Sequence, residues 1–160
     1  MEIRYATPDD AKAIAEVEAE CFPAAEAASL ASIKNRLQYY ANHFWLLEDN
    51  GRLIGFANGM VSNEDHLLDV MFDHGEMHDE NGKWQLIFGL DTIPEYRCRG
   101  CGEVLLNSAI EDAHKQNRMG LILTCKEQLI HYYEKFGFVK EGLSNSTHGK
   151  AVWYDMRLTF

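Results

Sequence analysis

A short loop of arginines, glycines and cysteines, Tyr96–Gly102 (YRCRGCG), holds the residue types best suited to chemistry in this sequence. It follows an apolar run, 84–90, and precedes a helical pattern that begins near Glu103. The first backbone N–H groups of a helix lack intrahelical partners, and the helix dipole adds positive potential there. Glycines beside such a helix start let a phosphate approach the main chain closely. The loop therefore predicts an anion site, with Arg97 and Arg99 supplying local positive charge.

Two other interpretations of this loop are open. Its spacing, Arg-x-x-Gly-x-Gly, matches neither the P-loop nor the Gly-x-Gly-x-x-Gly fingerprint, so a basic loop that only caps a helix is one alternative. Cys98 and Cys101 also have the Cys-x-x-Cys spacing of dithiol redox proteins. A zinc site would need two further soft ligands, and Cys21 and Cys125 form no second pair. We expect two small side chains in a loop whose backbone binds the ligand.

The loop resembles the pyrophosphate loop of the GCN5-related N-acetyltransferase (GNAT) family, whose members bind acetyl-coenzyme A (acetyl-CoA). A second segment, Tyr132–Phe138 (YYEKFGF), resembles a family motif in which a Tyr four residues before Gly-Phe lies beside the cofactor sulfur. Tyr133 occupies that place. Segments 7–11, 16–22, 123–129 and 131–138 are further similar to serotonin (arylalkylamine) N-acetyltransferases.

One departure from that group concerns the general base. The vertebrate members carry two histidines on the fourth strand, which help to relay the substrate's proton. Leu86 and Phe88 stand at those places here, so the histidine relay is absent. The candidate bases are Glu20, Asp91 and Glu127. Glu20 is preferred because it lies at the end of the first helix, where the family builds its substrate site.

The resemblance also implies roles for the other site residues. An aliphatic amine has a pKa of about 10, so it must lose a proton before it attacks a thioester. Tyr133 is the expected general acid for the departing thiolate, although its helical spacing with Leu129 and Phe136 would also suit a core aromatic. The backbone N–H near Leu90 is the expected oxyanion donor. The expected cofactor-binding residues are Leu90, Asp91 and Thr92 on the strand, the last two through their main chains, and Arg97, Cys98, Arg99, Gly100, Cys101, Gly102 and Glu103 beyond it.

Apolar periodicity and turn signals predict one α/β (α+β) domain over residues 1–160. Strands are expected over 2–5, 43–48, 53–61, 84–91, 121–125 and 151–160, and helices from Pro8 to before Pro23 and over 30–40, 103–117 and 128–136. The resemblance implies a mixed, mostly antiparallel sheet flanked by helices. In this family the fourth and fifth strands splay apart around the cofactor, and Gly89 is the expected start of the splay.

Composition limits the partners and the location. The formal net charge of -10 disfavours nucleic acid, because phosphate contacts need clustered Lys and Arg. No apolar run approaches the roughly 20 residues that span a bilayer, so no membrane association is expected. The N-terminus lacks the apolar stretch of a signal peptide, and a cytoplasmic location is the default expectation. The sequence leaves a homodimer open.

These observations predict an acetyl-CoA-dependent N-acetyltransferase that acts on a primary amine, most simply a small cationic one, by direct attack in a ternary complex. A protein N-terminus or lysine as acceptor, a non-catalytic acetyl-CoA-binding module and a dithiol redox protein are the alternatives. His74 and His78 have the spacing of a helical zinc pair. Gly75 and Asn81-Gly82 favour a solvated loop there, so no metal is expected.

Overall fold

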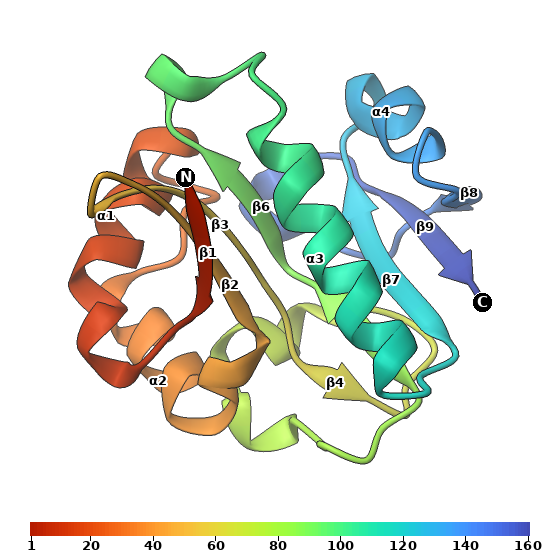
Figure 1. Ribbon diagram of the computed structural model, residues 1–160. Coiled ribbons are helices and arrows are strands. Elements are labelled where there is room, and N and C mark those ends of the chain that lie inside the picture. The colour runs from red at the N-terminus through yellow and green to blue at the C-terminus, as the bar shows by residue number, and fades with distance from the viewer.

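Two adjoining β-sheets run through the centre of the protein in this computed structural model, which describes residues 1–160 (Figure 1). The strands are β1 (Glu2–Tyr5), β2 (Phe44–Asp49), β3 (Arg52–Asn58), β4 (Val61–Ser62), β5 (Trp84–Ile87), β6 (Gly89–Thr92), β7 (Gly120–Cys125), β8 (Val139–Leu143) and β9 (Tyr154–Thr159). One sheet has the order β1-β2-β3-β6, and the other has the order β4-β5-β7-β9-β8. The α-helices are α1 (Ala11–Cys21), α2 (Leu30–Tyr40), α3 (Cys101–Lys115) and α4 (Ile130–Glu134). Short 3-10 helices cover Pro8–Asp10, Ala41–His43, Asp69–Asp73, Gly75–Met77, Pro94–Tyr96, Glu127–Leu129 and His148–Lys150.

The two sheets separate within one extended segment that the sequence predicts as a single strand. β5 pairs in parallel with β7, from Trp84 opposite Gly120 to Ile87 opposite Leu123. After Phe88, β6 pairs with β3 instead, so β6 and β7 diverge (Figure 1). All other strand pairs are antiparallel. These pairings confirm a mixed, mostly antiparallel fold that splays between the predicted fourth and fifth strands.

Glycines stand where the chain passes between the sheets. A Cβ atom on Gly59 would lie 1.8 Å from the carbonyl oxygen of Leu86, which no side chain can do. β3 therefore ends earlier than predicted, at Asn58, and the chain continues as β4 in the other sheet. A Cβ atom on Gly89 would lie 3.2 Å from Asp91 Oδ1 and 3.3 Å from Asn58 Nδ2. The missing side chain of Gly89 thus leaves room for polar groups at the splay.

Local signals account for the first elements of the fold. The Asp10 carboxylate accepts the Thr7 backbone N–H at 2.8 Å and caps the turn that leads into α1. The Ser29 side chain caps α2. Asn50 and Gly51 have φ angles of 50° and 80°, as a type I′ turn requires, and they join β2 to β3.

The C-terminal part differs from the expected elements in its boundaries. The expected helix over 128–136 is a single-turn 3-10 helix followed by the short α4. Gly137, at φ 97°, follows that helix with the positive φ that is typical of a residue just beyond a helix end. The last strand begins at Tyr154, because the residues before it form the His148–Lys150 turn. β9 then pairs with both β7 and β8.

Helices cover the first sheet and hold β6 in place. α3 crosses the front of the sheets in Figure 1 and buries Leu105 and Ala109. α1 packs against β3 and β6 with Ile14 and Val17 buried, and α2 packs beside α1. Burying a large apolar side chain contributes about 1.5–3 kcal/mol, so this packing fixes the strand that carries the candidate site. No helix of the structure has the length and apolarity needed to cross a membrane.

Candidate functional site

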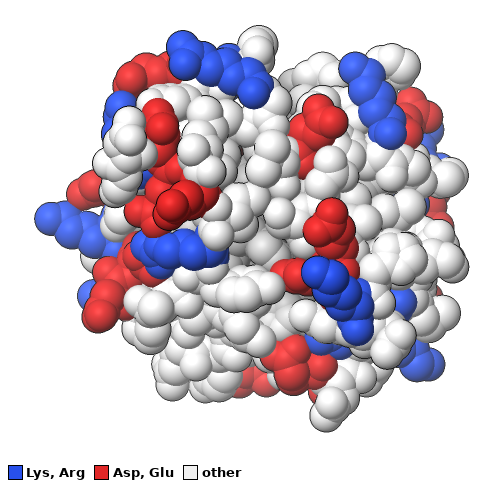
Figure 2. All heavy atoms as spheres, viewed as in Figure 1, with Lys and Arg blue, Asp and Glu red and all other residues white.

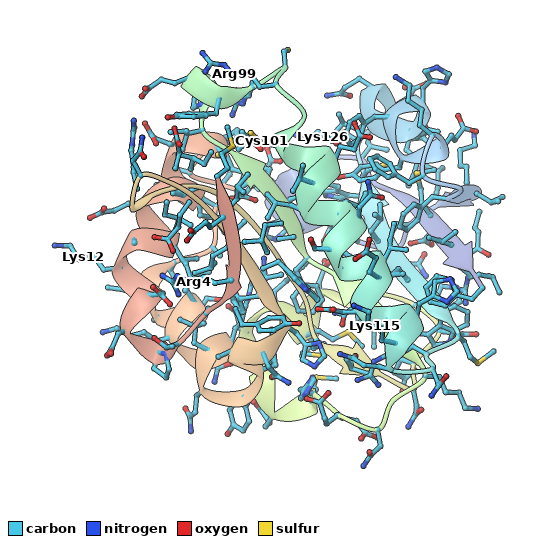
Figure 3. The ribbon with its side chains drawn as sticks, in the orientation of Figure 1. Arg4, Lys12, Arg99, Cys101, Lys115 and Lys126 are labelled. Carbon is cyan, nitrogen blue, oxygen red and sulfur yellow. The ribbon has the colours of Figure 1, made fainter.

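A groove of about 620 Å³ lies between β6, the loop after it, the start of α3 and α4. We call it the loop groove. Of the ten predicted cofactor residues, Arg99 alone does not line it; the nine that do are Leu90, Asp91, Thr92, Arg97, Cys98, Gly100, Cys101, Gly102 and Glu103. Arg99 lies at the top of Figure 3, where its guanidinium is 5.2 Å from the ring centre of Tyr96. The structure therefore brings the predicted anion-binding residues together.

The loop turns sharply into α3. Cys98 and Gly100 have φ angles of 62° and 80°, in the left-handed region, and α3 begins at the next residue, Cys101. The unpaired N–H groups of the first turn of α3 thus stand at the groove. A Cβ atom on Gly102 would lie 2.8 Å from the Tyr132 hydroxyl, so a larger residue would displace the ring that covers this helix start.

Arg97 bends back along β6. Its Nε donates to the carbonyl oxygen of Thr92 at 3.0 Å. Burial raises the pKa of the Cys21 thiol, and a hydrogen bond with Arg97 partly offsets that effect. Arg97 therefore ties the end of β6 to the end of α1 and still places its charge in the loop groove.

The edge of β6 that faces the splay offers free backbone donors. Ile93 N–H donates to the Ile54 carbonyl at 2.9 Å, and Asp91 lies opposite Phe56 in the same ladder. Because alternate residues of an antiparallel strand point their N–H groups to opposite edges, the N–H groups of Leu90 and Thr92 face away from β3. The main-chain N–H of Asp91 points toward β3, whereas the residue lines the loop groove, so its contact with the cofactor arm stays a prediction.

A second cavity of about 120 Å³ lies beyond the groove, and we call it the inner cavity. Aromatic rings of Phe22, Phe72, Phe88 and Trp153 form part of its wall. Its polar lining residues are Glu18, Glu26, Arg36, Asn58, Thr124, Ser146 and His148. The inner cavity and the loop groove share four lining residues, namely Phe22, Leu90, Leu129 and Tyr133. The two spaces therefore meet beside the free edge of β6.

Tyr133 lies at this meeting point. The residue is 8% exposed, and its ring packs edge-on against Tyr132 and Phe138. Burial raises the pKa of Tyr133 well above the ordinary value for a phenol. Its hydroxyl is therefore protonated throughout the neutral range and can act as a proton donor at the junction of the two cavities.

The carboxylate that α1 places in the site is Glu18. Glu18 is 7% exposed, lines the inner cavity and accepts the Ala28 N–H at 2.9 Å. The predicted bases Glu20 and Glu127 are exposed, and neither lines the loop groove or the inner cavity. Helix geometry is the reason, because Glu18 follows Ile14 by one turn on the buried face of α1, whereas Glu20 falls on the solvent side.

Asp91 lies beside Glu18 and is almost fully buried. Burial, and then the neighbouring Glu18 carboxylate, raises the pKa of Asp91 well above its ordinary value. Neither oxygen of Asp91 accepts a hydrogen bond from a protein donor. A protonated Asp91 that donates to Glu18 explains both facts, since two adjacent buried carboxylates hold one proton between them.

The cysteines of the loop lie in different surroundings. Cys98 is exposed at the loop groove, whereas Cys101 is 3% exposed in the first turn of α3. Both are free thiols, as are Cys21 and Cys125.

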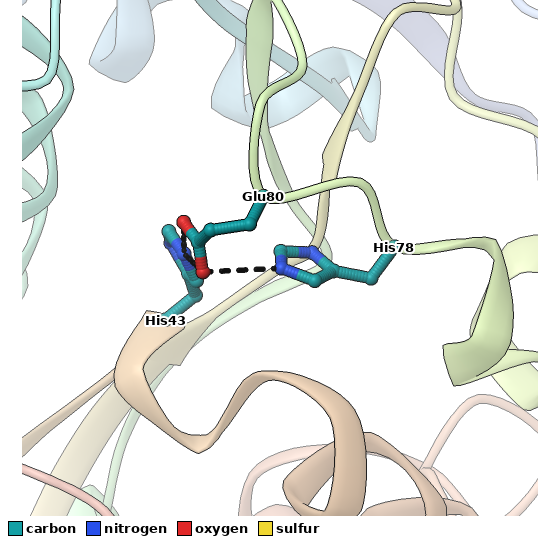
Figure 4. A group of neighbouring side chains, drawn as sticks. All are labelled: His43, His78 and Glu80. Atoms are coloured by element: carbon teal, nitrogen blue, oxygen red, sulfur yellow. Dashed lines mark hydrogen bonds and ion pairs between the residues drawn. The ribbon is translucent and has the colours of Figure 1, made fainter.

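The structure also groups two histidines with a glutamate, although not the predicted pair. His78 lies with His43 and Glu80 (Figure 4), while His74 pairs with Glu76 on the surface. Gln85 Nε2 donates to backbone carbonyls, and its Oε1 lies 2.8 Å from His43 Nδ1.

The hydrogen bonds of this cluster leave little capacity for a cation. His78 Nδ1 accepts the Val61 N–H at 2.9 Å, so the proton of a neutral His78 is on Nε2, which faces Glu80. Glu80 also accepts from His43 at 2.8 Å and from Arg118 at 3.0 Å. Protein donors thus surround the carboxylate, and the cluster links the 3-10 helix Ala41–His43, the segment before β5 and the turn after α3.

Charge over the rest of the surface is mixed. The face in Figure 2 shows acidic and basic side chains interspersed, without a continuous basic area. With a formal net charge of -10, the arginines of the loop are a local exception in an acidic protein. Such an arrangement favours a compact anionic group at the loop over an extended polyanion.

Comparisons with known proteins agree with this geometry. The model of the acetyltransferase (GNAT) family matches residues 11–138. The chain is 26% identical over 168 residues to serotonin N-acetyltransferase of Mesocricetus auratus, covering 98% of this chain and 76% of that protein. Its fold is similar to the GphF GNAT-like decarboxylase in complex with isobutyryl-CoA, with a TM-score of 0.81, 18% identity and 99% of both chains covered. It is also similar to ribosomal-protein-S18-alanine N-acetyltransferase of Escherichia coli, with a TM-score of 0.69, 19% identity, and 99% of this chain and 92% of that chain covered.

The family match includes the loop of the groove and Tyr133, the two features on which the sequence resemblance depends. The chain therefore belongs to the GNAT acetyltransferase family and is an N-acetyltransferase.

Proposed function

We propose that this enzyme transfers an acetyl group from acetyl-CoA to a primary amine by direct attack in a ternary complex. The observation that carries the proposal is the meeting of the loop groove and the inner cavity at Leu90 and Tyr133. A thioester at the inner end of the groove is then within reach of an amine held in the inner cavity. The GphF complex with isobutyryl-CoA supports an acyl-CoA donor in this fold.

The residues of the loop groove would hold the donor. The start of α3 offers N–H groups and a positive dipole to the pyrophosphate. Arg97 and Arg99 add positive charge at the same place. The free N–H of Thr92 suits a carbonyl of the pantetheine arm, and that of Leu90 suits the oxyanion of the tetrahedral intermediate.

The Glu18–Asp91 pair is the proposed general base, in place of Glu20. With one shared proton, the pair carries a single negative charge beside the inner cavity, so it attracts an ammonium group. It can also accept the ammonium proton, because a second proton removes the buried charge. Glu18 supplies the side that faces the acceptor, and Asp91 is buried behind it.

The complete transfer uses two protons. The ammonium proton passes to the Glu18–Asp91 pair, and the amine nitrogen then bonds to the thioester carbon. The Leu90 N–H stabilises the oxyanion, the C–S bond breaks, and Tyr133 gives its hydroxyl proton to the sulfur. The second nitrogen proton, lost as the amide forms, restores the Tyr133 hydroxyl.

The size and walls of the inner cavity favour a small amine. A cavity with aromatic walls suits a small molecule better than a folded protein surface. A protein N-terminus is the second candidate. It is favoured by an open hollow near Asp69 and Asp73, which shares Arg36 and Phe72 with the inner cavity. In a non-catalytic binding module, the Tyr133 hydroxyl at the junction would have no catalytic role.

The test is thiol release from acetyl-CoA with a panel of small amines and of peptides with free N-termini. We expect turnover with small amines, with calorimetric binding of acetyl-CoA as the parallel measurement. Acetyl-CoA binding without turnover of any acceptor would support the non-catalytic module. Failure to bind acetyl-CoA would contradict the proposal entirely.

A further inference from the structure

A buried arginine in the inner cavity has no acidic partner. Arg36 is 5% exposed and lines the inner cavity. Its Nε donates to the carbonyl oxygen of Phe72 at 3.0 Å, and its Nη1 donates to Asn58 Oδ1 at 3.0 Å. Its Nη2 donates to no protein group, and no carboxylate forms an ion pair with the guanidinium. Glu18 lines the same inner cavity but makes no hydrogen bond with Arg36, so the guanidinium keeps unused donor capacity there.

Asn58 presents a second unused donor at the same place. Its Oδ1 is taken by Arg36, which directs its Nδ2 to the other side. Asn58 is 1% exposed, and its Nδ2 is buried without a hydrogen-bond partner. A Cβ atom on Gly89 would come within 3.3 Å of this nitrogen, so the glycine leaves room next to it. Arg36 and Asn58 therefore both line the inner cavity with an unused donor, and that of Asn58 is buried beside Gly89, where Asp91 and Glu18 also lie.

Their place in the sheet relates these donors to the reacting atoms. Asn58 lies opposite Gly89, and Leu90, the proposed oxyanion donor, is the next residue along β6. Adjacent residues of a strand are about 3.4 Å apart. An anionic group bound at Arg36 and Asn58 would thus lie very near the attacking amine. In an α-amino acid, the amine and the carboxylate are attached to one carbon, which matches this short separation.

The charges of the inner cavity suit a zwitterion. Glu18 attracts the ammonium group from one side, and Arg36 attracts a carboxylate from another. The Arg36 guanidinium lies 5.7 Å from the ring centre of Phe72 and 5.3 Å from that of Phe88. These rings form an apolar wall for a side chain beside the carboxylate.

We propose that the acceptor of this N-acetyltransferase is an α-amino acid with an apolar or aromatic side chain, whose carboxylate is bound by Arg36 and Asn58. This inference rests on the proposed function, since it names the class of amine. The proposed acceptor differs from that of an enzyme for simple arylalkylamines, because those amines carry no carboxylate.

Matched acceptors provide the first part of the test. Acetylation of L-tryptophan and L-phenylalanine is compared with that of tryptamine and 2-phenylethylamine, which lack only the carboxylate, and with that of the two amino acid amides. We expect kcat/KM for the amino acids to exceed that for the amines and amides by about tenfold or more, because a buried donor left unsatisfied is costly. Equal or better turnover of the amines would overturn the inference and leave the proposed function standing.

Variants provide the second part. Asn58→Asp changes the unused donor to an acceptor and adds a negative charge, so kcat/KM should fall about tenfold or more for the amino acids and much less for the amines. Arg36→Lys keeps the positive charge but loses the paired N–H donors of the guanidinium, so it should raise KM for the amino acids and not for the amines. Ser32→Ala is the control, because Ser32 Oγ donates to the same Phe72 carbonyl at 3.0 Å and does not line the inner cavity.

The outcomes separate the possible failures. If Asn58→Asp and Ser32→Ala lower the rates with amino acids and amines alike, Arg36 and Asn58 only hold the Phe72 segment, and the inference is wrong. If Asn58→Asp does not fold, the Arg36→Lys variant and the matched acceptors still test the inference. If acetyl-CoA binds but none of the acceptors is acetylated, the proposed function fails together with this inference.

Discussion

Tyr133 and Glu18 illustrate what single residues contribute to this site. Both are buried, and each would be read as a core position from its neighbours in the helix. The function proposed for each depends on the end of the side chain, and both residues line the inner cavity. Substitutions that keep the packing and remove only the polar group therefore separate the packing role of each residue from its proposed chemical role.

Tyr133→Phe tests the general acid. The ring and its packing remain, so we expect normal folding and an acetyl-CoA affinity close to that of the wild type. Turnover should fall by about 10²-fold, the usual scale for a lost general acid. Because burial raises the pKa of Tyr133, its hydroxyl should cause no alkaline limb below pH 10 in the wild type. Steady-state rates of both proteins across pH provide the measurement, and equal turnover at every pH would leave Tyr133 a core aromatic.

Glu18→Gln tests the base, with Glu20→Gln as its matched control on the same helix. Removing the carboxylate of Glu18 leaves Asp91 without its proton partner, so turnover at neutral pH should fall by about 10²-fold. A rise in pH that deprotonates the amine in solution should restore part of the rate. Glu20 is exposed and lies outside both cavities, so its variant should match the wild type. A larger loss of turnover in Glu20→Gln than in Glu18→Gln would indicate that Glu20 is the general base.

The loop and the first turn of α3 act as one element. Gly100→Val forces a branched residue to a φ of 80°, and Gly102→Val drives a side chain against the Tyr132 hydroxyl. Both variants should weaken acetyl-CoA binding by at least about tenfold in calorimetry. Gly142→Val is the control, because Gly142 also has a positive φ but lies in β8, away from the groove. Unchanged affinity in both loop variants would exclude the groove as the cofactor site.

The two loop thiols belong to the same element. Alkylation should reach the exposed Cys98 and spare the buried Cys101, and it should block acetyl-CoA by bulk. The double variant Cys98→Ser, Cys101→Ser should keep most of the activity, because the backbone is expected to bind the ligand. If that variant binds acetyl-CoA normally and has no turnover, then the thiols take part in the chemistry.

At the scale of the whole molecule, Glu80 links distant segments and makes stability depend on pH. Burial alone would raise the pKa of Glu80, but hydrogen bonds from Asn42, His43 and His78 together lower it to about 2. The ionised carboxylate therefore stabilises the folded state above its ordinary pKa of 4.5, and this contribution is lost as the pH falls from 4.5 toward 2.

Glu80→Gln should reduce the free energy of unfolding at pH 7 by about 1–2 kcal/mol, because hydrogen bonds to a charged group are lost from a half-exposed position. The difference from the wild type should shrink as the pH approaches 3. Chemical denaturation at several pH values measures it, with Glu76→Gln as the control, since Glu76 pairs with a histidine on the surface. A difference that does not change with pH would contradict the assigned role.

The sequence alone determined the features that depend on near neighbours. The helix starts near Pro8 and Leu30, the turn between the strands expected over 43–48 and 53–61, and the helix after the glycine loop were predicted correctly, because caps and positive φ angles are set within a few residues. Tyr133 and most of the loop residues line one groove, and the roles that the family resemblance implies for them stay predictions.

Only the tertiary structure decided which polar side chains meet. Glu18 rather than Glu20 enters the site because α1 packs against β6 with the face that carries Glu18. In the sequence, the only sign of this is weak: Glu18 is an acidic residue on the apolar face of the helix. Arg36 and Asn58 come from different elements, and their side chains form a hydrogen bond only when α2 packs near β3. Burial and unsatisfied donors are properties of the packed molecule, so no local pattern can reveal them.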